Sequence, residues 1–435
     1  MHLHNTHVTQ AKPGGHVRPL APLLLAALLL GGCAGLGERE GGQAGSADGT
    51  GPMTFATGRD TTAYLQPLID KWNRAHPKEP VTLLELPEAA DEQRAQMVAN
   101  LQARSDRYDV LGLDVVLTAE FADAGWIVPL DGGLFKLDRF LPPVVDTAMY
   151  NGKLYAVPYT SNAGLLYYRK DILDREHLKP PKTWAELRDQ ATRLGRKYKL
   201  DGYAGQFLPY EGLTVNFAEA VQSAGGQILS PDGARVTMDL GTATTGLNFL
   251  VDGLREGWIP QEALTYKEEE SRLAFQEGKL LFARNWPHAY GPATRSTLAG
   301  KFAVTRLPGL NGPGSSSLGG NNLAISAYSK HQKSALEFIR YFTGLENERS
   351  VLTDGSFPPV WSELYDDPAL IKRYPYLPVL KESIMSARPR PASSNYDQVS
   401  LAISSAVSDA LDLRKPGDET VAALKQELGE IIRTP

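Results

Sequence analysis

The chain of 435 residues contains one cysteine, Cys33, so no disulfide can form within it and no structural cysteine–zinc site is expected. It also lacks an excess of positive charge, because 45 lysines and arginines stand against 50 aspartates and glutamates, for a net charge of −5. A chain without an excess of basic side chains has no strong positive field to attract the phosphate backbone of a nucleic acid. We therefore expect no nucleic-acid partner.

Short catalytic and cofactor motifs are missing as well. The sequence has no G-x-S-x-G, H-E-x-x-H, G-x-x-x-x-G-K-[ST] or G-x-G-x-x-G segment. The histidines that follow Cys33 are far apart in the sequence, at positions 76, 177, 288 and 331. We expect no catalytic residue, no metal and no cofactor, although triads and carboxylate pairs are spatial arrangements that can form without a local motif.

The apolar run near the N-terminus is too short to cross a membrane. Leu20–Leu30 follows Lys12 and Arg18, and as a helix it would span about 16 Å, against about 30 Å for a bilayer core. The next residues complete Leu-Gly-Gly-Cys at 30–33, which resembles the lipobox of bacterial lipoproteins. We predict a lipoprotein signal peptide over 1–32 and lipid attachment at Cys33; the alternative is a plain secretory signal followed by an incidental cysteine.

A flexible tether and then a folded region are predicted beyond the leader. Residues 33–52 include seven glycines, which is typical of a flexible linker. The remainder fits a soluble globular protein of one or two large domains, since the chain is 42% apolar and 22% charged. Strand-like and helical patterns alternate from Met53, which predicts α/β domains with largely parallel sheets and ligands beyond the strand ends. Thr183 and Glu186 form a capping box that should begin a helix.

Five segments resemble the extracellular solute-binding proteins of ABC sugar importers, and within them the trehalose/maltose-binding lipoproteins. They are YDVLGLDVVLTAEFADAGWIVPL at 108–130, NGKLYAVPYTSNAGLLYYRKDIL at 151–173, FQEGKLLFARNWPHAY at 275–290, LGGNNLAISAYSKHQKSALEFIRYF at 318–342 and RPASSNYDQVSLAI at 390–403. The resemblance implies a periplasmic-binding-protein-like type II fold, in which two α/β lobes are joined by a hinge of several crossings.

By the layout of that family, lobe I would hold 53–158 with about 323–358, and lobe II would hold 159–318 with about 359–435. The crossings would fall near 158–162 and 318–322, where the pair Gly319-Gly320 suits a hinge because glycine tolerates large backbone changes.

The resemblance also implies a function. The chain would be a monomer held by its lipid on the extracytoplasmic face of a bacterial cell membrane, and it would deliver an α-linked disaccharide, trehalose first, to permease subunits with a cytoplasmic ATPase. One alternative is a receptor for maltose, maltodextrin or another glycoside. Two others come from different classes: a lipid-anchored glycoside hydrolase, and a surface adhesin or sensor with the same fold.

Sugar hydroxyls are matched by carboxylates, amides and arginine, and the C–H faces of a sugar are matched by aromatic rings. Asp114, just after an apolar strand, matches the lobe I aspartate of the family that takes hydroxyls, and Asp60 lies near another ligand position. Either aspartate could instead cap a helix. Trp286 matches the tryptophan that stacks on a sugar ring, whereas His288 stands where some relatives have a tyrosine.

The remaining ligand residues implied by the resemblance lie at the crossings and in lobe II. Asn162 stands where some relatives carry aspartate. At Gly320 and Asn321 members of the family use backbone groups and the adjacent side chain, and relatives can place an aromatic ring at the Asn321 position. Arg390 matches an arginine that forks onto hydroxyls, with Arg388 as a close competitor. Glu268 heads an acidic run, a pattern that is also typical of a solvated helix face.

Overall fold

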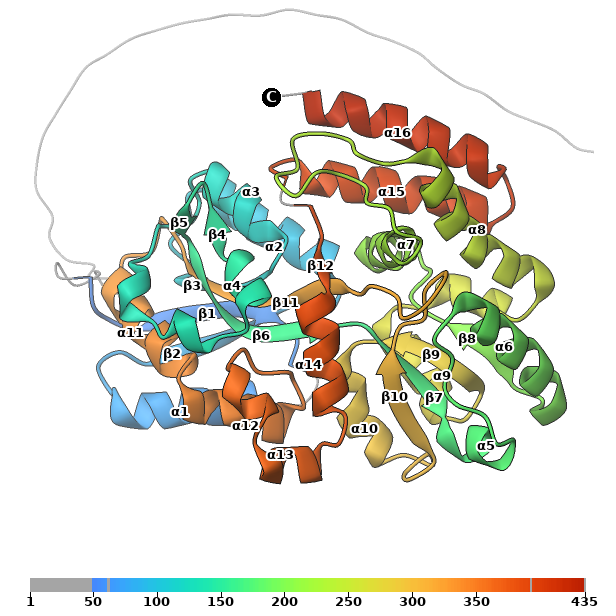
Figure 1. The fold of residues 1–435 in the computed structure, drawn as a ribbon. Coiled ribbons are helices and arrows are strands. Elements are labelled where there is room, and N and C mark those ends of the chain that lie inside the picture. The colour runs from blue at the N-terminus through green and yellow to red at the C-terminus, as the bar shows by residue number, and fades with distance from the viewer. Residues whose placement is uncertain (1–48, 61–62, 392, 434–435) are drawn as a thin grey trace, which may run out of the picture. The chain divides into compact units, whose positions relative to one another are not determined.

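Two separate β-sheets organise the part of the chain that the computed structural model describes, residues 49–60, 63–391 and 393–433 (Figure 1). The first sheet has six strands in the order β12-β11-β3-β1-β2, with β6 paired to β11. Its strands are β1 (Met53–Gly58), β2 (Val81–Leu86), β3 (Val110–Asp114), β6 (Ala156–Ala163), β11 (Ser317–Ile325) and β12 (Arg388–Pro389). The predicted leader, Cys33 and most of the predicted tether lie outside the described residues.

The second sheet has four strands in the order β10-β7-β9-β8. They are β7 (Leu165–Arg169), β8 (Asp201–Ala204), β9 (Leu280–Asn285) and β10 (Phe302–Arg306); a separate hairpin joins β4 (Met149–Tyr150) to β5 (Lys153–Leu154). The prediction of largely parallel sheets is wrong. β11 runs antiparallel to both β3 and β6, and β7 runs antiparallel to both β9 and β10. Alternating strands and helices show where strands occur, but they do not fix the direction in which a late strand enters a sheet.

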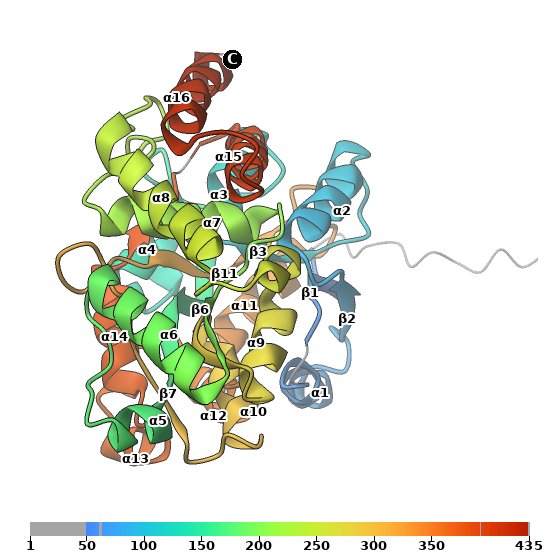
Figure 2. The same ribbon diagram turned by 90° about the vertical axis from the view of Figure 1, so that its right-hand side faces the viewer.

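Helices cover both sheets, as the two views show (Figures 1 and 2). Those beside the first sheet are α1 (Leu65–Ala75), α2 (Ala90–Gln102), α3 (Leu117–Asp123), α4 (Pro142–Asp146), α11 (Gln332–Phe342) and α12 (Leu345–Gly355). Those beside the second are α5 (Lys170–Arg175), α6 (Trp184–Tyr198), α7 (Glu211–Ser223), α8 (Leu240–Glu256), α9 (Glu268–Gln276) and α10 (Tyr290–Thr294). Helices α15 (Tyr396–Leu411) and α16 (Gly417–Arg433) pack in turn on α7 and α8. Short 3-10 helices are η1 (Gly132–Leu134), η2 (Leu137–Arg139), η3 (Gln261–Thr265), η4 (Pro287–Ala289) and η5 (Ser362–Tyr365).

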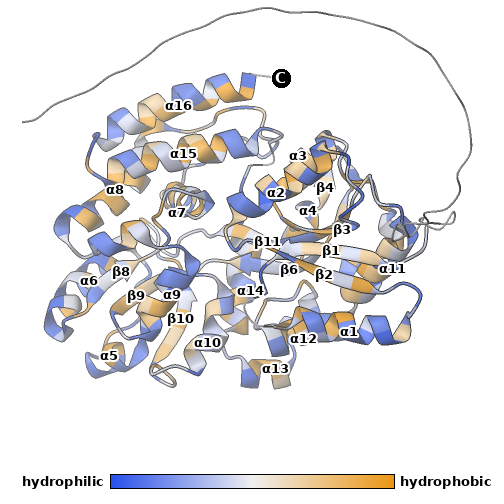
Figure 3. Cartoon of the chain, turned by 180° about the vertical axis from the view of Figure 1, so that it is seen from behind, coloured by the Kyte–Doolittle hydropathy of each residue, from blue (hydrophilic) through white to orange (hydrophobic). Residues whose placement is uncertain are grey.

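Apolar faces explain why these helices pack where they do. Phe338 and Phe342 on α11 contact Phe55 of β1 edge to face, and Trp72 of α1 packs against Phe338. The hydropathy colouring shows such apolar stripes turned inward and polar residues outward (Figure 3). The predicted capping box is confirmed, because Thr183 accepts from the Glu186 N–H and Glu186 accepts from the Thr183 N–H. Within the described ranges, no helix has both the length and the apolar character needed to cross a bilayer.

The remaining helices, α13 (Pro368–Arg373) and α14 (Leu377–Ser386), lie at the junction of the two sheets, where α14 packs on both β6 and β10 (Figure 1). Both predicted crossings fall in this central region, as the neighbouring strands β6 and β11. The pairing shifts register between Asn321 and Asn322, so the two strands are irregular at the point where the hinge is expected.

Gly320 makes the close approach of these strands possible. Its φ is +130°, a conformation that side-chain-bearing residues rarely adopt, and a Cβ at this position would lie 2.2 Å from the Thr160 carbonyl oxygen. A side chain here would therefore clash with the backbone of β6 and could be accepted only if the strands moved apart.

We predict that Gly320→Ala destabilises the protein by about 1–3 kcal/mol, because it adds both backbone strain and a backbone clash. Thermal unfolding of the purified protein measures this as a lower midpoint. Gly312→Ala is the matched control, since a Cβ at Gly312 would meet open space. Equal midpoints for the two variants would contradict the role given to Gly320.

Candidate functional site

Seven of the eight predicted ligand residues line one cavity of about 110 Å³, which we call the inner cavity. It lies where the ends of β3, β6, β9 and β11 meet the first turns of α2 and α7. Its lining consists of Ala90, Asp114, Asn162, Tyr210, Glu211, Gly212, Val215, Glu268, Trp286, Gly319, Gly320, Asn321 and Arg390. Residues that are up to 300 positions apart in the sequence are therefore brought together, as expected for strand ends that face one cleft.

Asp60 is the predicted residue that does not line the inner cavity. It lies on an adjoining cavity of about 130 Å³, which shares Asn321 with the inner one. Its Oδ2 accepts from the backbone N–H of Leu65 at 2.7 Å, at the start of α1. Asp60 thus accepts from the first N–H of α1 although the N-cap of that helix is Tyr64, and its contact with a ligand stays a prediction.

A buried arginine ties the inner cavity together. Arg390, 5% exposed, donates from Nη2 to Asp114 Oδ1 at 2.6 Å and from Nη1 to Glu211 Oε1. Asp114 ends β3 and Glu211 begins α7, so the Arg390 guanidinium links a strand of the first sheet to a helix beside the second sheet. Burial alone would lower the pKa of Arg390, but the two carboxylates hold it well above its usual range. The competing residue Arg388 lies in β12 and donates instead to the Gly226 carbonyl.

Glu211 was not among the predicted residues. It is a buried carboxylate that also accepts from the Tyr396 hydroxyl at 2.6 Å and from the Ser400 hydroxyl. Burial raises the pKa of Glu211, and Arg390 opposes that shift. The sequence gives one signal for Glu211. It is an acidic residue that begins the segment EGLTVNFAEAV, whose next residues are apolar or small, so its charge must be buried. A buried charge needs a partner, and this indicates a contact with another polar group.

Trp286 is fixed on several sides at the end of β9. Its backbone N–H donates to Asn285 Oδ1 at 2.7 Å, and its carbonyl accepts from the Tyr167 hydroxyl at 2.8 Å. The Arg284 guanidinium lies 3.9 Å from the centroid of the indole ring, and a Cβ on Gly319 would come within 3.1 Å of two ring carbons. The ring is therefore held in place before any ligand reaches it, as a stacking residue requires.

Glu268 and Tyr210 form a second pair at the inner cavity. The Tyr210 hydroxyl donates to Glu268 Oε2 at 2.6 Å, and Tyr210 was also missed by the sequence reasoning. Its ring folds back over Gly212, where a Cβ would lie 2.2 Å from the ring. His288 does not line this cavity; its ring lies 5.9 Å from that of Phe357, and burial lowers the pKa of His288 to about 4.

Two polar atoms on the lining have no hydrogen-bond partner in the described part of the protein. They are Asn162 Oδ1 and Arg390 Nε, both buried. A buried polar atom without a partner is rare, and each one needs an explanation such as a bound ligand. The described residues hold no group of three or more histidines, cysteines or acidic side chains that could bind a metal. The arrangement offers one acceptor, one donor, carboxylates and an aromatic ring, which together suit a neutral polyhydroxyl compound.

Comparisons with known proteins place the chain among binding proteins. The model of the bacterial extracellular solute-binding protein family matches residues 56–349. A probable ABC transporter-binding protein of Deinococcus radiodurans is 34% identical over 368 residues, which cover 81% of this chain and 86% of the relative. A maltotriose-binding protein of Pyrococcus abyssi is 26% identical over 72% of this chain and 68% of its own length.

Solved structures agree with the sequence matches. The maltose-bound MalE3 of T. maritima superposes with a TM-score of 0.82 at 30% identity, and the match covers 87% of this chain and 99% of that one. The prediction of a type II fold with two α/β lobes is confirmed by this likeness. Members of the matching family bind solutes and are not enzymes, so the hydrolase alternative is set aside. The match over most of the chain, together with the 34% identical relative, shows that this chain belongs to the bacterial extracellular solute-binding protein family.

Proposed function

We propose that this chain is the substrate-binding component of an ABC importer and that it captures an α-linked disaccharide, with trehalose as the first candidate. One observation carries the proposal: the inner cavity combines a fixed tryptophan, paired carboxylates and two buried polar atoms without protein partners. The printed names of the relatives, which include a maltose-bound and a maltotriose-binding protein, support a glucoside ligand. Trehalose itself rests on the resemblance to the trehalose/maltose-binding lipoproteins.

Maltose is the second candidate. The T. maritima relative, which is the more similar of the two named glucoside binders, has maltose bound. Asn321 and His288 replace aromatic residues that relatives can use for further stacking, which favours a short ligand over a long glucan. A disaccharide that binds between the lobes would contact Asp114 from one side and Trp286 from the other.

The mechanism is a shift of population and not a reaction. A ligand that contacts both lobes binds their closed arrangement more tightly than the open one, and so it stabilises closure. The closed form then docks on permease subunits that are driven by a cytoplasmic ATPase. In this proposal lobe I holds 53–158 with about 323–358, lobe II holds 159–318 with about 359–435, and β6 and β11 provide the crossings.

We also propose that the protein acts as a monomer at the extracytoplasmic face of the cell membrane, attached by a lipid on Cys33. This rests on the lipobox-like residues 30–33 and on the glycine-rich segment that follows them. A lipid on a flexible tether would keep the receptor near its permease and leave it free to turn.

We predict that the protein binds trehalose or maltose with micromolar affinity and that Trp286→Ala weakens this binding about 30-fold. Loss of a well-packed tryptophan from a binding site costs about 2 kcal/mol or more. Isothermal titration with trehalose, maltose, sucrose and glucose measures the affinity. Trp286→Phe is the matched control, because it keeps an aromatic face and should lose less.

The ligand class is tested by the same titrations. If maltose binds and trehalose does not, the proposed receptor function stands and its ligand is maltose. If none of the four sugars binds, the disaccharide proposal is contradicted. Asp114→Asn should also weaken binding, by more than about tenfold, because a hydrogen bond to a charged group contributes about 1.5–3 kcal/mol. Circular dichroism of each variant checks that the fold is retained.

We predict that Cys33→Ser releases the protein from the membrane fraction and abolishes incorporation of a labelled fatty acid. Cys33 is the single cysteine of the chain, so no other thiol can accept the lipid. Fractionation and autoradiography after expression in a bacterial host measure both effects. Ser46→Ala, in the same tether, is the control and should stay lipidated. Incorporation of the labelled fatty acid into the Cys33→Ser protein would contradict the lipobox interpretation.

A further inference from the structure

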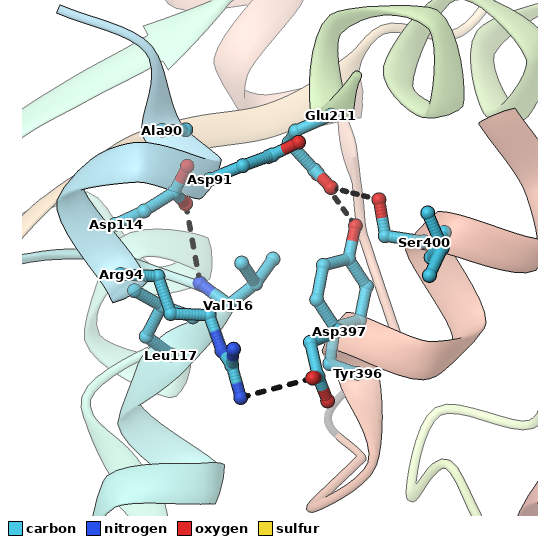
Figure 4. Close-up of a pocket in the computed structure, with 11 residues that line it drawn as sticks. Ala90, Asp91, Arg94, Asp114, Val116, Leu117, Glu211, Tyr396, Asp397 and Ser400 are labelled. Carbon is cyan, nitrogen blue, oxygen red and sulfur yellow. Dashed lines mark hydrogen bonds and ion pairs between the residues drawn. The ribbon is translucent and has the colours of Figure 1, made fainter. Parts of the chain in front are cut away.

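A larger cavity adjoins the inner one, and its chemistry differs. This outer cavity has a volume of about 200 Å³ and shares Ala90, Asp114 and Glu211 with the inner cavity. Its other lining residues are Asp91, Arg94, Val116, Leu117, Tyr396, Asp397, Ser400 and Leu401. They come from α2 and the turn after β3 on one side, and from α15 on the other (Figure 4).

Most of the acidic and basic side chains of the outer cavity have protein partners. Arg94 binds Glu120 and lies 3.1 Å from Asp397, so α2 and α15 are joined by an ion pair (Figure 4). Asp91, on the same helix as Arg94, is exposed. Arg94 and Asp397 are thus held by protein contacts at the rim of the cavity.

The same holds for the remaining polar lining. Asp114 accepts from Arg390, and Glu211 accepts from Arg390, Tyr396 and Ser400. Apart from Asp91, the polar side chains that line the outer cavity are therefore paired within the protein. Among the residues of the inner cavity, in contrast, the buried atoms Asn162 Oδ1 and Arg390 Nε have no hydrogen-bond partner in the described ranges.

The surface left between these pairs is apolar. Val116 and Leu117 form part of the wall, at 7% and 6% exposure. Leu401 on α15 also lines the cavity and is 70% exposed, the largest exposure among the large apolar side chains of the described residues. An exposed leucine that is continuous with a ligand cavity marks a place where an apolar group can be buried.

We propose, on the basis of the function proposed above, that the outer cavity holds an apolar substituent carried by the bound sugar, such as a short alkyl, acyl or aryl group. The sugar would use the unpaired polar atoms of the inner cavity. The substituent would pass Asp114 and Glu211, the residues that both cavities share, and cover Val116, Leu117 and Leu401. The receptor would thus prefer a substituted glycoside to the bare sugar.

Two matched ligand pairs test this inference on the full chain, purified in mild detergent. One pair is trehalose and 6-O-butanoyltrehalose, and the other is methyl α-maltoside and phenyl α-maltoside. For a parent sugar that binds, we expect the substituted partner to bind about tenfold more tightly and with a more negative heat-capacity change, because apolar surface is buried. Equal or weaker binding of both substituted ligands would overturn the inference.

A variant pair locates the gain in the outer cavity. Leu401→Ser should remove most of the advantage of the substituted ligand, because it removes the exposed apolar side chain at this cavity. Leu273→Ser is the control, since Leu273 on α9 is 46% exposed and lines neither cavity. An advantage that survives Leu401→Ser unchanged would overturn the assignment.

The two proposals fail in different ways. If neither parent sugar nor substituted ligand binds, the function proposed above fails. If the parent sugars bind and substitution gives no gain, the sugar receptor stands and only the role of the outer cavity is lost. A gain with added glucose units in maltotriose, but none with phenyl or butanoyl groups, would likewise assign the cavity to sugar and overturn the inference.

Discussion

The geometry of the binding region depends on one buried cation. Arg390 is enclosed by protein and is held by Asp114 at 2.6 Å and by Glu211. A buried charge that loses its partner costs about 3–5 kcal/mol, so the structure must keep both carboxylates in place. The end of β3, the first turn of α7 and the segment after β12 are therefore obliged to converge, and the inner cavity forms where they meet.

That constraint also divides the cleft by chemistry. Asp114 and Glu211 use part of their hydrogen-bonding capacity on Arg390, so only the lone pairs that remain can accept from a ligand. Asp114 and Glu211 are shared by both cavities, but the unpaired atoms Asn162 Oδ1 and Arg390 Nε belong to the inner one. In the function proposed above, the smaller cavity takes the hydroxyl groups and the larger one takes an apolar substituent.

Sequence patterns predicted much of the site because its residues stand at recognisable places. Asp114 directly follows an apolar strand, and Trp286 and Arg390 lie in segments that resemble a known family, so each could be named before the structure. Glu211 and Tyr210 escaped because their roles depend on partners far away in the chain, Arg390 and Glu268. Local sequence cannot show which distant group a buried carboxylate will meet.

The directions of the strands escaped for a related reason. Periodicity located β11 and β7, but the antiparallel pairing of β11 with β3 and β6 follows from how the chain returns between the lobes, which no local pattern records. Asp60 shows the opposite case. The same carboxylate that could meet a ligand also accepts from the Leu65 N–H, so one residue type in one loop fits both a helix cap and a binding group.

Strand β11 links the binding region to the expected hinge through direct contacts. At Gly319 the strand passes so close to the Trp286 ring that a Cβ would lie 3.1 Å from it, and at Gly320 a Cβ would lie 2.2 Å from the Thr160 carbonyl oxygen of β6. The next residue, Asn321, donates its backbone N–H to the Thr160 hydroxyl at 3.0 Å and lines the inner cavity. Because interiors are closely packed, a ligand that presses on the indole ring must also press on β11, and through β11 on β6. The glycine pair thus does two things at once: it leaves room for the Trp286 ring, and it brings that ring into contact with the strands where the hinge is expected.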